Sequence, residues 1–494
     1  MRTCQIYKLH HGIECQKEAG YSEPDGIELC VLHSRNKEKD RTVFEDEIKK
    51  KLNEQDFDFS GIYFHKSIDF RINFKGFVQF SRAEFASLAN FRGATFEGDG
   101  EVYFDEVKFN GLVNFSNALF YNKVDFSFAE FHHDAKFNSV KFYNDVSFYY
   151  SKFLFSADYS KAEFLKKDAT ILFCNSQLNG STLFKDTVFF GIPDFRESKI
   201  SNVDFSGTEF LLGAQFTETE FLEGLHFFEC FFCKNGGTVF FDRSKFVGIV
   251  KFYNTKFLGP TFFRNSEVEG EVRFENINPE NQDFHVKFID LKIYPDSILE
   301  MKNTSLINAQ FEDTDVRKIK FHNVNWCSYH GRKAIYDEIY QAKKRLESVE
   351  NFAKVEELYR YLKINYENNG DLKNAGDFHY GEMEIHRKSS PWRRYFSWYA
   401  VYWVLSGYGE RPLRALFVLA GLILILPAIV WSLGTEGYLN TLLFFIEKAT
   451  LQRPAWPQGI TWGGKLWSTL SVIFIPGQAA LFLLALRNRL GRRR

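Results

Sequence analysis

Four residues near the start of the chain have the types and spacing of a metal-binding group. They are Cys4, Cys15, Cys30 and His33. Three thiolates and one imidazole are a tetrahedral ligand set of structural zinc. Residues 1–40 are polar and have few large apolar side chains, so a bound metal would take the place of a core. The sequence predicts a structural zinc knuckle, with His10 and His11 as competing ligands; the alternative is a disordered leader with incidental cysteines.

A second group of polar residues lies in or beside apolar stretches in the last fifty residues. Its members are Glu447, Thr450, Gln452, Ser468, Ser471 and Gln478. The last three recur at helical spacing, which places them along one stripe of a helix. Polar side chains in a membrane face water or a partner helix. We predict that the six residues contact a pore or its vestibule; the alternative is that the stripe packs helices together.

Other residue types that could do chemistry do not form a catalytic group. No Ser/His/Asp arrangement and no pair of carboxylates stands out, so we expect no enzyme. Cys230 and Cys233 form a CxxC pair with no second pair, which predicts buried wall cysteines rather than a metal or redox site. Glu382, Glu384 and His386 predict a solvated helix face rather than a metal site.

Composition favours a repeat protein with a basic tail. The chain has 494 residues, of which 57 are phenylalanine, and a formal net charge of −1. Residues 57–326 contain 29 lysines and arginines against 37 acidic residues, whereas residues 387–494 contain 14 against 3. The tail, rather than the body, is therefore expected to contact a membrane or polyanion. Seven cysteines and a polar start without a signal peptide predict thiols that are reduced, or bound to metal, and face the cytoplasm.

A phenylalanine rhythm dominates the middle of the chain. In one stretch the phenylalanines are Phe115, Phe120, Phe126, Phe131, Phe137, Phe142 and Phe148. Their intervals alternate between five and six residues, and a small apolar residue stands two positions before each. Positions i−2 and i share a face of an extended chain, whereas five residues turn through about 140° on a helix. The rhythm predicts short strands wound into a solenoid with these rings as its core.

The pattern resembles the pentapeptide-repeat family over residues 57–326. The resemblance implies a mostly β fold, a right-handed quadrilateral β-helix with one small and one bulky apolar residue pointing inward on each face. This chain adds one residue to every second repeat, which we expect to widen alternate turns. The turns between 277 and 305 are not assigned from the sequence. Such rods are typically scaffolds.

After residue 326 the spacing becomes helical. Residues 328–390 predict two antiparallel helices, with Asn369 and Gly370 ending the first and Asp371 capping the second. This segment resembles the one that follows the repeats in membrane-attached members of the family, and the knuckle resembles their N-terminal segment. The predicted domains are a knuckle (1–40), a linker (41–56), the β-helix (57–326), the connector (328–390), an interfacial helix (391–410) and a transmembrane hairpin with a re-entrant segment (411–494).

Two long apolar stretches predict membrane spans. Residues 415–433 and 466–486 are 19 and 21 residues long and contain no charge. Each is long enough to cross about 30 Å of hydrocarbon as a helix. Arginines precede the first span and follow the second, which predicts two spans in the cytoplasmic (inner) membrane with both termini in the cytoplasm. The alternative is a soluble protein with two buried helices.

The segment between the spans bears on function. Residues 438–446 are apolar but too short to cross a membrane, which is typical of a re-entrant helix. This layout resembles two-span pore-loop channels, and the end of the second span resembles that of pentapeptide-repeat proteins with an ion-channel-like tail. Potassium filters use TVGYG. Here residues 449–454 read ATLQRP, and the one Gly-Tyr-Gly, at 407–409, precedes the first span and predicts a turn. Potassium selectivity is therefore not supported.

Two functional hypotheses follow. In the first, the protein is a channel-like protein of the lipid bilayer, a symmetric homo-oligomer around a pore with the β-helix as a cytoplasmic sensing or assembly domain. In the second, the spans are anchors and the β-helix is an interaction scaffold that binds a protein partner. A DNA mimic needs a strongly acidic surface, so the interleaved lysines of the β-helix make nucleic acid binding unlikely.

Overall fold

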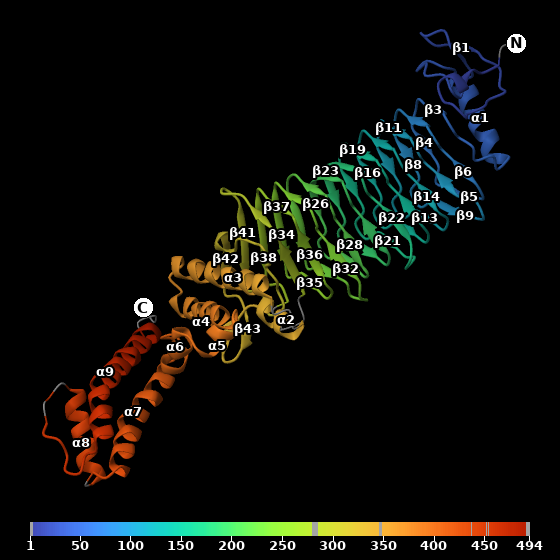
Figure 1. Ribbon diagram of the computed structural model, residues 1–494. Helices are drawn as coiled ribbons and strands as arrows, with labels where there is room; N and C mark the ends of the chain where they lie inside the picture. The colour runs from blue at the N-terminus through green and yellow to red at the C-terminus, as the bar shows by residue number, and fades with distance from the viewer. Residues whose placement is uncertain are drawn as a thin grey trace. The chain divides into compact units, whose positions relative to one another are not determined.

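The computed structural model describes residues 3–278, 285–344, 348–435, 437–450, 452 and 454–490. They form two compact units (Figure 1). The first contains the chain up to Thr314 together with Lys318–Asn325, and the second contains Asp315–Arg317 and Trp326–Arg494. Each unit is described by itself below.

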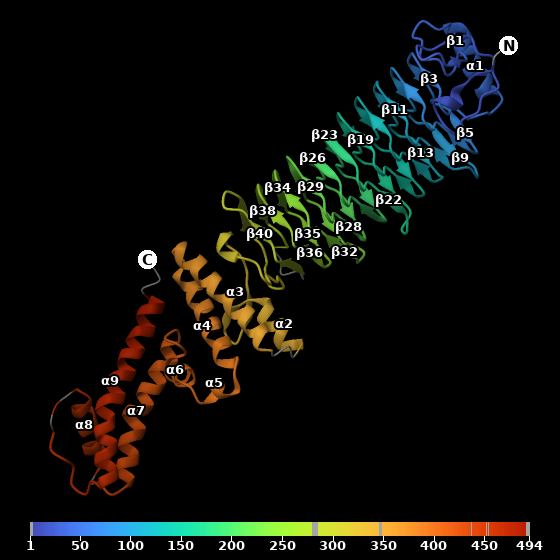
Figure 2. The same ribbon diagram turned by 45° about the horizontal axis from the view of Figure 1, so that its top comes forward.

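The first unit is a solenoid of about 12 turns (Figures 1 and 2). One coil contains four short strands, β3 (Tyr63–Phe64), β4 (Ile68–Asp69), β5 (Asn73–Lys75) and β6 (Val78–Gln79). The chain then returns to β7 (Glu84–Phe85), which pairs with β3 in parallel. The four stacks that begin with β3 to β6 end with β40 (Lys292–Ile293), β42 (Ile319–His322), β35 (Lys256–Phe257) and β39 (Val286–Ile289). Two longer strands, β23 (Gln177–Leu183) and β26 (Lys199–Asp204), join two of the stacks into one sheet.

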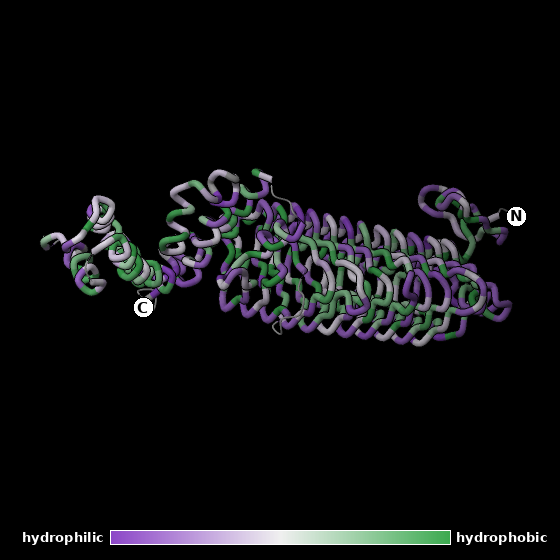
Figure 3. The backbone as a smooth tube through the Cα atoms, turned by 60° about the horizontal axis from the view of Figure 1, so that its bottom comes forward, coloured by the Kyte–Doolittle hydropathy of each residue, from purple (hydrophilic) through white to green (hydrophobic). Residues whose placement is uncertain are grey.

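The solenoid interior consists of phenylalanine columns. All seven phenylalanines from Phe115 to Phe148 are buried. Each ring stacks on the ring one coil away; Phe115 and Phe137 are 5.1 Å apart between centroids, and Phe126 and Phe148 are 4.9 Å apart. Figure 3 shows hydrophobic and hydrophilic residues alternating around the coils. The predicted fold class is confirmed, while the right-handed winding remains a prediction.

Turns of two kinds alternate around each coil. Each five-residue interval between Phe104 and Phe153 contains one residue with a positive φ: Glu106, Asn117, Phe128, Ser139 and Tyr150. The six-residue intervals in the same described stretch contain none. The extra residue in every second repeat therefore removes the need for a left-handed residue at that corner.

The solenoid continues through the stretch whose turns the sequence left unassigned. β38 (Glu271–Glu275) pairs in parallel with β41 (Ile298–Lys302), and β36 (Thr261–Arg264) pairs with β39. Residues 279–284, which belong to this stretch, lie outside the described residues. The coils therefore keep their register on both sides of that segment.

The N-terminal segment covers the first edge of the solenoid (Figure 1). It contains a short 3-10 helix (Ile6–Lys8), the antiparallel pair β1 (Tyr21–Ser22) and β2 (Glu28–Leu29), and α1 (Arg41–Asn53), which occupies the expected linker. The Tyr63 amide donates to Leu32 O at 3.0 Å, and the Phe44 ring lies 5.9 Å from that of Phe64. These contacts cover an edge that would otherwise be open to pairing with another strand.

The second unit begins with the connector. An antiparallel pair, β43 (Cys327–Tyr329) and β44 (Arg332–Ala334), precedes α2 (Tyr336–Lys344), α3 (Val349–Asn368) and α4 (Leu372–Lys388). The Asp371 side chain caps α4, as predicted, by accepting from the Asn374 amide at 3.1 Å. Leu346, one of the expected apolar positions, lies outside the described residues.

The prediction that Glu382 and Glu384 face solvent is wrong. Both side chains are buried on α4. Glu382 accepts from Arg360 at 3.1 Å, and Glu384 accepts from Arg387 at 2.8 Å. Burial of a carboxylate requires such partners. Arg387 lies three residues after Glu384 on the same helix, whereas Arg360 comes from α3, whose approach the sequence does not reveal.

The tail consists of two short and three longer helices. They are α5 (Pro391–Tyr395), α6 (Trp398–Ser406), α7 (Pro412–Ser432), α8 (Tyr438–Ala449) and α9 (Trp462–Leu490). Helices α7 and α9 are long and apolar enough to cross a membrane. Figures 1 and 2 show them side by side, with α8 beside them at the predicted re-entrant position.

Candidate metal centre

The knuckle brings its four predicted ligands together from separate parts of the chain. Strand β2 leads directly into Cys30, and a tight turn follows in which the His33 amide donates to Cys30 O at 3.2 Å. The Cys4 amide donates to Lys17 O at 2.9 Å, which brings the first cysteine to the chain just after Cys15. The ligand atoms of Cys4, Cys15, Cys30 and His33 all lie within 4.8 Å of one another.

The spacing of these atoms fits a tetrahedral ion. The His33 Nδ1 atom lies 3.4 Å from Cys4 Sγ and 3.3 Å from Cys30 Sγ, and the Cys15 and Cys30 sulfurs are 3.9 Å apart. Zinc at its usual bond lengths would place tetrahedral ligand atoms roughly 3.5–3.8 Å apart. His10 and His11, the predicted competitors, are outside this cluster.

The His33 ring is oriented by a contact on its other side. Its Nε2 atom lies 3.3 Å from Ser60 O, so an Nε2–H group can donate there and leave the Nδ1 lone pair facing the sulfurs. Metal-binding histidines commonly have such a backbone partner. Because Ser60 lies at the start of the solenoid, this contact joins the Cys/His cluster to the first coil.

The electrostatics of the cluster also favour a cation. Hydrogen bonds from Cys30 and Cys4 lower the pKa of Cys15, while the Cys15 contact raises the pKa of Cys30. Burial alone would lower the pKa of His33, but the neighbouring Cys15 and Cys4 sulfurs raise it to about 9. A metal binds cysteine as the thiolate, so binding of a metal here would release protons.

The polar residues of α9 contact their own chain. Ser468, Ser471 and Gln478 are buried. The two serine hydroxyls donate to carbonyls of the preceding turn, at 2.8 Å and 2.6 Å. Gln478 Nε2 donates to Leu405 O at 2.8 Å and to Ala415 O at 2.9 Å, so this side chain ties α9 to the end of α6 and the start of α7.

The other three predicted pore residues lie at the end of α8. The Thr450 hydroxyl donates to Glu447 O at 2.9 Å, and the Gln452 amide donates to the same carbonyl at 3.0 Å. Both Thr450 and Gln452 are exposed. Thr450 also lines an otherwise apolar groove of about 450 Å³ between α7, α8 and α9.

Two structural residues had no distinguishing signal in the sequence. Lys39 is buried, and its Nζ atom donates to the carbonyls of Ser34 and Tyr63 at 3.0 Å and 2.7 Å, joining the knuckle to the first coil. Burial lowers the pKa of Lys39 to about 7. Tyr408 is buried in the Gly-Tyr-Gly turn and lies 3.1 Å from Glu384 through its hydroxyl. Only the glycines beside it indicated a turn.

The repeats match a known family. The chain matches pentapeptide repeats (9 copies) over residues 70–119 and again over residues 99–141. Within these residues the solenoid is similar to pentapeptide repeats. Comparison with curated proteins found no match, and neither did comparison with solved structures. The knuckle and the two apolar helices lie outside the matched residues and are therefore interpreted from their own residues.

Proposed function

We propose that the protein is a membrane-anchored interaction scaffold, in which the pentapeptide-repeat solenoid binds a protein partner and the tail holds it at a bilayer. The observation that carries this proposal is the hydrogen bonding of the Gln478 side chain. Its amide group bonds to two backbone carbonyls of its own chain, at 2.8 Å and 2.9 Å. Ser468 and Ser471 are also buried within the chain. The polar stripe thus packs against helices of its own chain, which supports an anchor over a role in lining a pore.

The surface of the tail supports the anchor. Leu413 and Ile473 project from α7 and α9 with most of their surfaces exposed. Exposed aromatic residues, including Trp392 and Trp398, lie on α5 and α6 just before the first span. Trp and Tyr are enriched where a protein crosses the membrane–water interface. Basic residues flank both long helices on the same side, which supports a cytoplasmic membrane with both termini in the cytoplasm.

The solenoid surface favours a protein partner over nucleic acid. Glutamate and lysine alternate along one face, where Glu84, Lys108, Glu130 and Lys152 occupy equivalent positions in successive coils. Lys152 and Glu130 are 3.3 Å apart, and Lys199 and Glu220 on the same face are also 3.3 Å apart. A row that alternates in sign presents neither the acidic surface of a DNA mimic nor a basic groove for nucleic acid.

We further propose that the metal of the knuckle is zinc and that its role is structural. Three cysteines and one histidine leave no open coordination position for catalysis. The cluster also lies where the N-terminal segment covers the first coil, so the ion would stabilise that cover. Purified protein is expected to contain about one zinc per chain.

Ion flux tests the scaffold proposal. Full-length protein is reconstituted into liposomes, and potassium and chloride fluxes are compared with those of empty liposomes. A scaffold gives no added flux, with or without a membrane potential. Added flux that is lost in Gln478→Leu would overturn the proposal, because this side chain would then serve conduction.

A channel is the second candidate, favoured by the position of α8. This helix of 12 residues packs beside both α7 and α9, which is the order of elements expected for a pore module. A channel would require a symmetric oligomer, because two spans do not enclose a pore. The variants Gln478→Leu and Ser471→Leu separate the candidates: loss of permeability supports a channel, whereas loss of tail stability or of oligomers alone supports a scaffold.

A further inference from the structure

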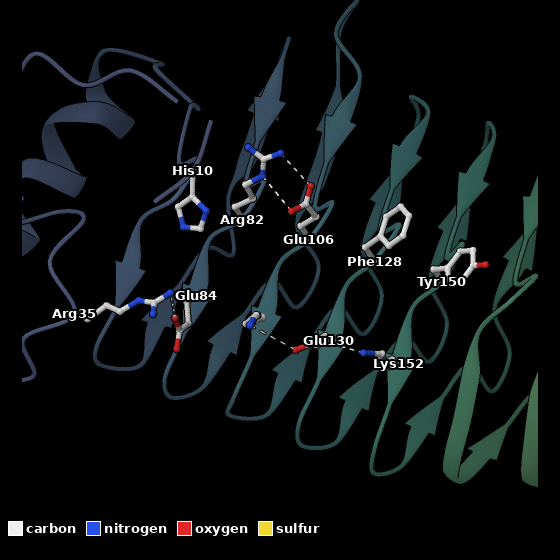
Figure 4. A pocket seen from close by; sticks show the side chains of 10 residues that line it. His10, Arg35, Arg82, Glu84, Glu106, Phe128, Glu130, Tyr150 and Lys152 are labelled. Atoms are coloured by element: carbon white, nitrogen blue, oxygen red, sulfur yellow. Dashed lines mark hydrogen bonds and ion pairs between the residues drawn. The ribbon is translucent and has the colours of Figure 1, made fainter. Parts of the chain in front are cut away.

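A groove on the solenoid beside the knuckle has features that folding does not require. Its volume is about 570 Å³, within the range of small-ligand and peptide side-chain pockets. Its walls come from two parts of the chain: His10 and Arg35 belong to the knuckle, and the other charged and aromatic side chains belong to successive coils. Figure 4 shows two rows: Phe128 and Tyr150 follow Arg82 and Glu106 along one edge, and the Glu/Lys ladder forms the other.

Phe128 and Tyr150 occupy strained backbone positions. Their φ angles are 59° and 55°, in the left-handed region that bulky residues rarely adopt. Each stands at a corner where the backbone N–H bonds to the next coil. The other described residues of this column are glycine or polar: Gly61, Arg82, Glu106, Asn175, Glu197, Glu218, Arg243, Asn265 and Asp290. Aromatic residues therefore interrupt the column only beside the groove.

These two aromatic side chains are also exposed. Phe128 is 50% exposed and Tyr150 is 45% exposed, and their rings stack 5.4 Å apart. Neither ring lies in the solenoid core, so the core does not account for the strain. Strained backbone together with exposed apolar surface is typical of a binding site.

Four cationic side chains, Arg35, Arg82, Lys108 and Lys152, line the groove with three carboxylates, Glu84, Glu106 and Glu130. The side chains of Arg35, Lys108 and Lys152 are 54%, 51% and 47% exposed, whereas those of Glu84 and Glu130 are 21% and 26% exposed.

All three carboxylates already have partners, and Glu106, whose side chain is 48% exposed, pairs with Arg82 at 3.1 Å. Glu84 accepts from Asn110 at 2.9 Å and lies 3.3 Å from Arg35, and Glu130 accepts from Lys152 at 3.3 Å and lies 3.2 Å from His132. Lys108 Nζ is 3.7 Å from Glu130, longer than a hydrogen bond. The donors of these cations remain available to a ligand with acceptor groups.

We propose that this groove binds an acidic peptide segment of a partner protein, with an aromatic or aliphatic side chain of the peptide packed against Phe128 and Tyr150. The carboxylates of the peptide pair with Arg35, Lys108 and Lys152. The inference rests on the scaffold function proposed above and specifies the partner's chemistry and the binding surface. Exposed ion pairs of this kind weaken as salt rises, so the affinity falls with ionic strength.

The test uses a phage-displayed library of random 12-residue peptides, selected against the full-length protein in detergent. Enriched sequences are synthesised, and their affinities are measured by fluorescence anisotropy. We expect enriched peptides to combine acidic and aromatic or aliphatic residues. Phe128→Asn/Tyr150→Asn is expected to weaken their binding roughly tenfold or more, because aromatic anchors dominate such interfaces.

The variant keeps the fold intact for a physical reason. Asparagine already occupies the same column at Asn175 and Asn265 and tolerates left-handed φ, so the melting temperature should not fall by more than a few degrees. The matched control is Tyr121→Asn/Tyr143→Asn, which removes another exposed stacked pair, 4.6 Å apart and outside the groove, and should leave affinity unchanged.

Several results would overturn the inference. They are a selection that enriches no sequence, enriched peptides without acidic residues, and equal binding by the groove variant. A protein that fails to associate with membranes yet binds these peptides would contradict the anchor proposal alone, so the two failures are distinguishable.

Discussion

The solenoid and the paired helices of the tail contain the same apolar residue types but bury them in opposite ways. Phe126 in the solenoid is 0% exposed and stacks between Phe104 and Phe148, with each ring centroid 4.9 Å away. Phe417 on α7 is 73% exposed. In the most apolar stretches of α7 and α9, only 17% and 22% of the residues are buried within the protein. The solenoid forms its core from its own repeats, whereas the tail helices leave most of their apolar surface exposed to their surroundings.

This difference shows that the spacing of apolar residues along the chain decides whether the protein can bury them by itself. A repeat that returns to the same face every coil stacks each ring on its equivalent, so the interior closes without other material. A continuous apolar helix of about twenty residues has no polar side to present to water. The first pattern specifies a hydrophobic core inside the protein, and the second specifies a helix that needs an apolar environment around it.

Metal removal should produce the largest effect and should confine it to the first unit. Chelation at neutral pH is expected to unfold the knuckle, because it has little apolar core and structural zinc contributes about 10 kcal/mol in small domains. Metal analysis and hydrogen exchange of residues 4–34 measure this. Cys30→Ser should lose the metal, whereas Cys174→Ser, at a solenoid cysteine outside the cluster, should retain it. Unchanged exchange after complete chelation would show that the fold does not depend on metal.

Truncation of phenylalanine tests the opposite burial in the two regions. Phe126→Ala should destabilise the solenoid by about 3–5 kcal/mol, the usual cost of a cavity left by a buried ring. Phe417→Ala, the matched control, should change the stability of the protein in detergent by less than about 0.5 kcal/mol. Denaturant unfolding followed by circular dichroism provides both values. Similar losses at the two positions would contradict the comparison.

Replacing Gln478 tests whether the tail also has a specific interior. Gln478→Leu leaves two buried carbonyls without this donor and should destabilise the packing of α9 by about 1–3 kcal/mol. Thermal unfolding in detergent measures the change. Ile473→Leu, at an exposed position on α9, is the control and should have no effect. A neutral Gln478→Leu would mean that the tail helices associate without this contact.

The smallest predicted effect is a pH dependence of the connector. Burial alone would raise the pKa of Glu382, but contacts with His379 and Arg360 lower it to about 2. Because the folded pKa lies below that of the unfolded chain, this stabilisation is complete above about pH 4.5 and is lost as pH falls toward 2. Because solvent screens this partly accessible ion pair, Glu382→Gln should cost only about 1 kcal/mol at pH 7. The variant should also unfold with a weaker dependence on pH between 4.5 and 2. Identical acid profiles would show that the ion pair contributes nothing.

The sequence was sufficient where the information is local. The five- and six-residue intervals predicted the solenoid because each repeat obeys the same rule, and ligand types predicted the Cys/His cluster before its geometry was known. It was insufficient where distant segments meet. The burial of Lys39 and Glu382 depends on partners from other elements, and helix α1 formed where a linker was expected because Phe44 packs on the first coil. Gln478 was assigned to a polar stripe, but only the fold showed that its partners were Leu405 and Ala415.

Membrane residence tests the central claim most directly. The full-length protein is mixed with phosphatidylcholine and phosphatidylglycerol liposomes during reconstitution, washed with alkaline carbonate and floated on a density gradient. The account predicts that the protein floats with the lipid after the wash, because α7 and α9 lie within the hydrocarbon. Protein that remains at the bottom of the gradient, folded and monodisperse without detergent, would contradict the account.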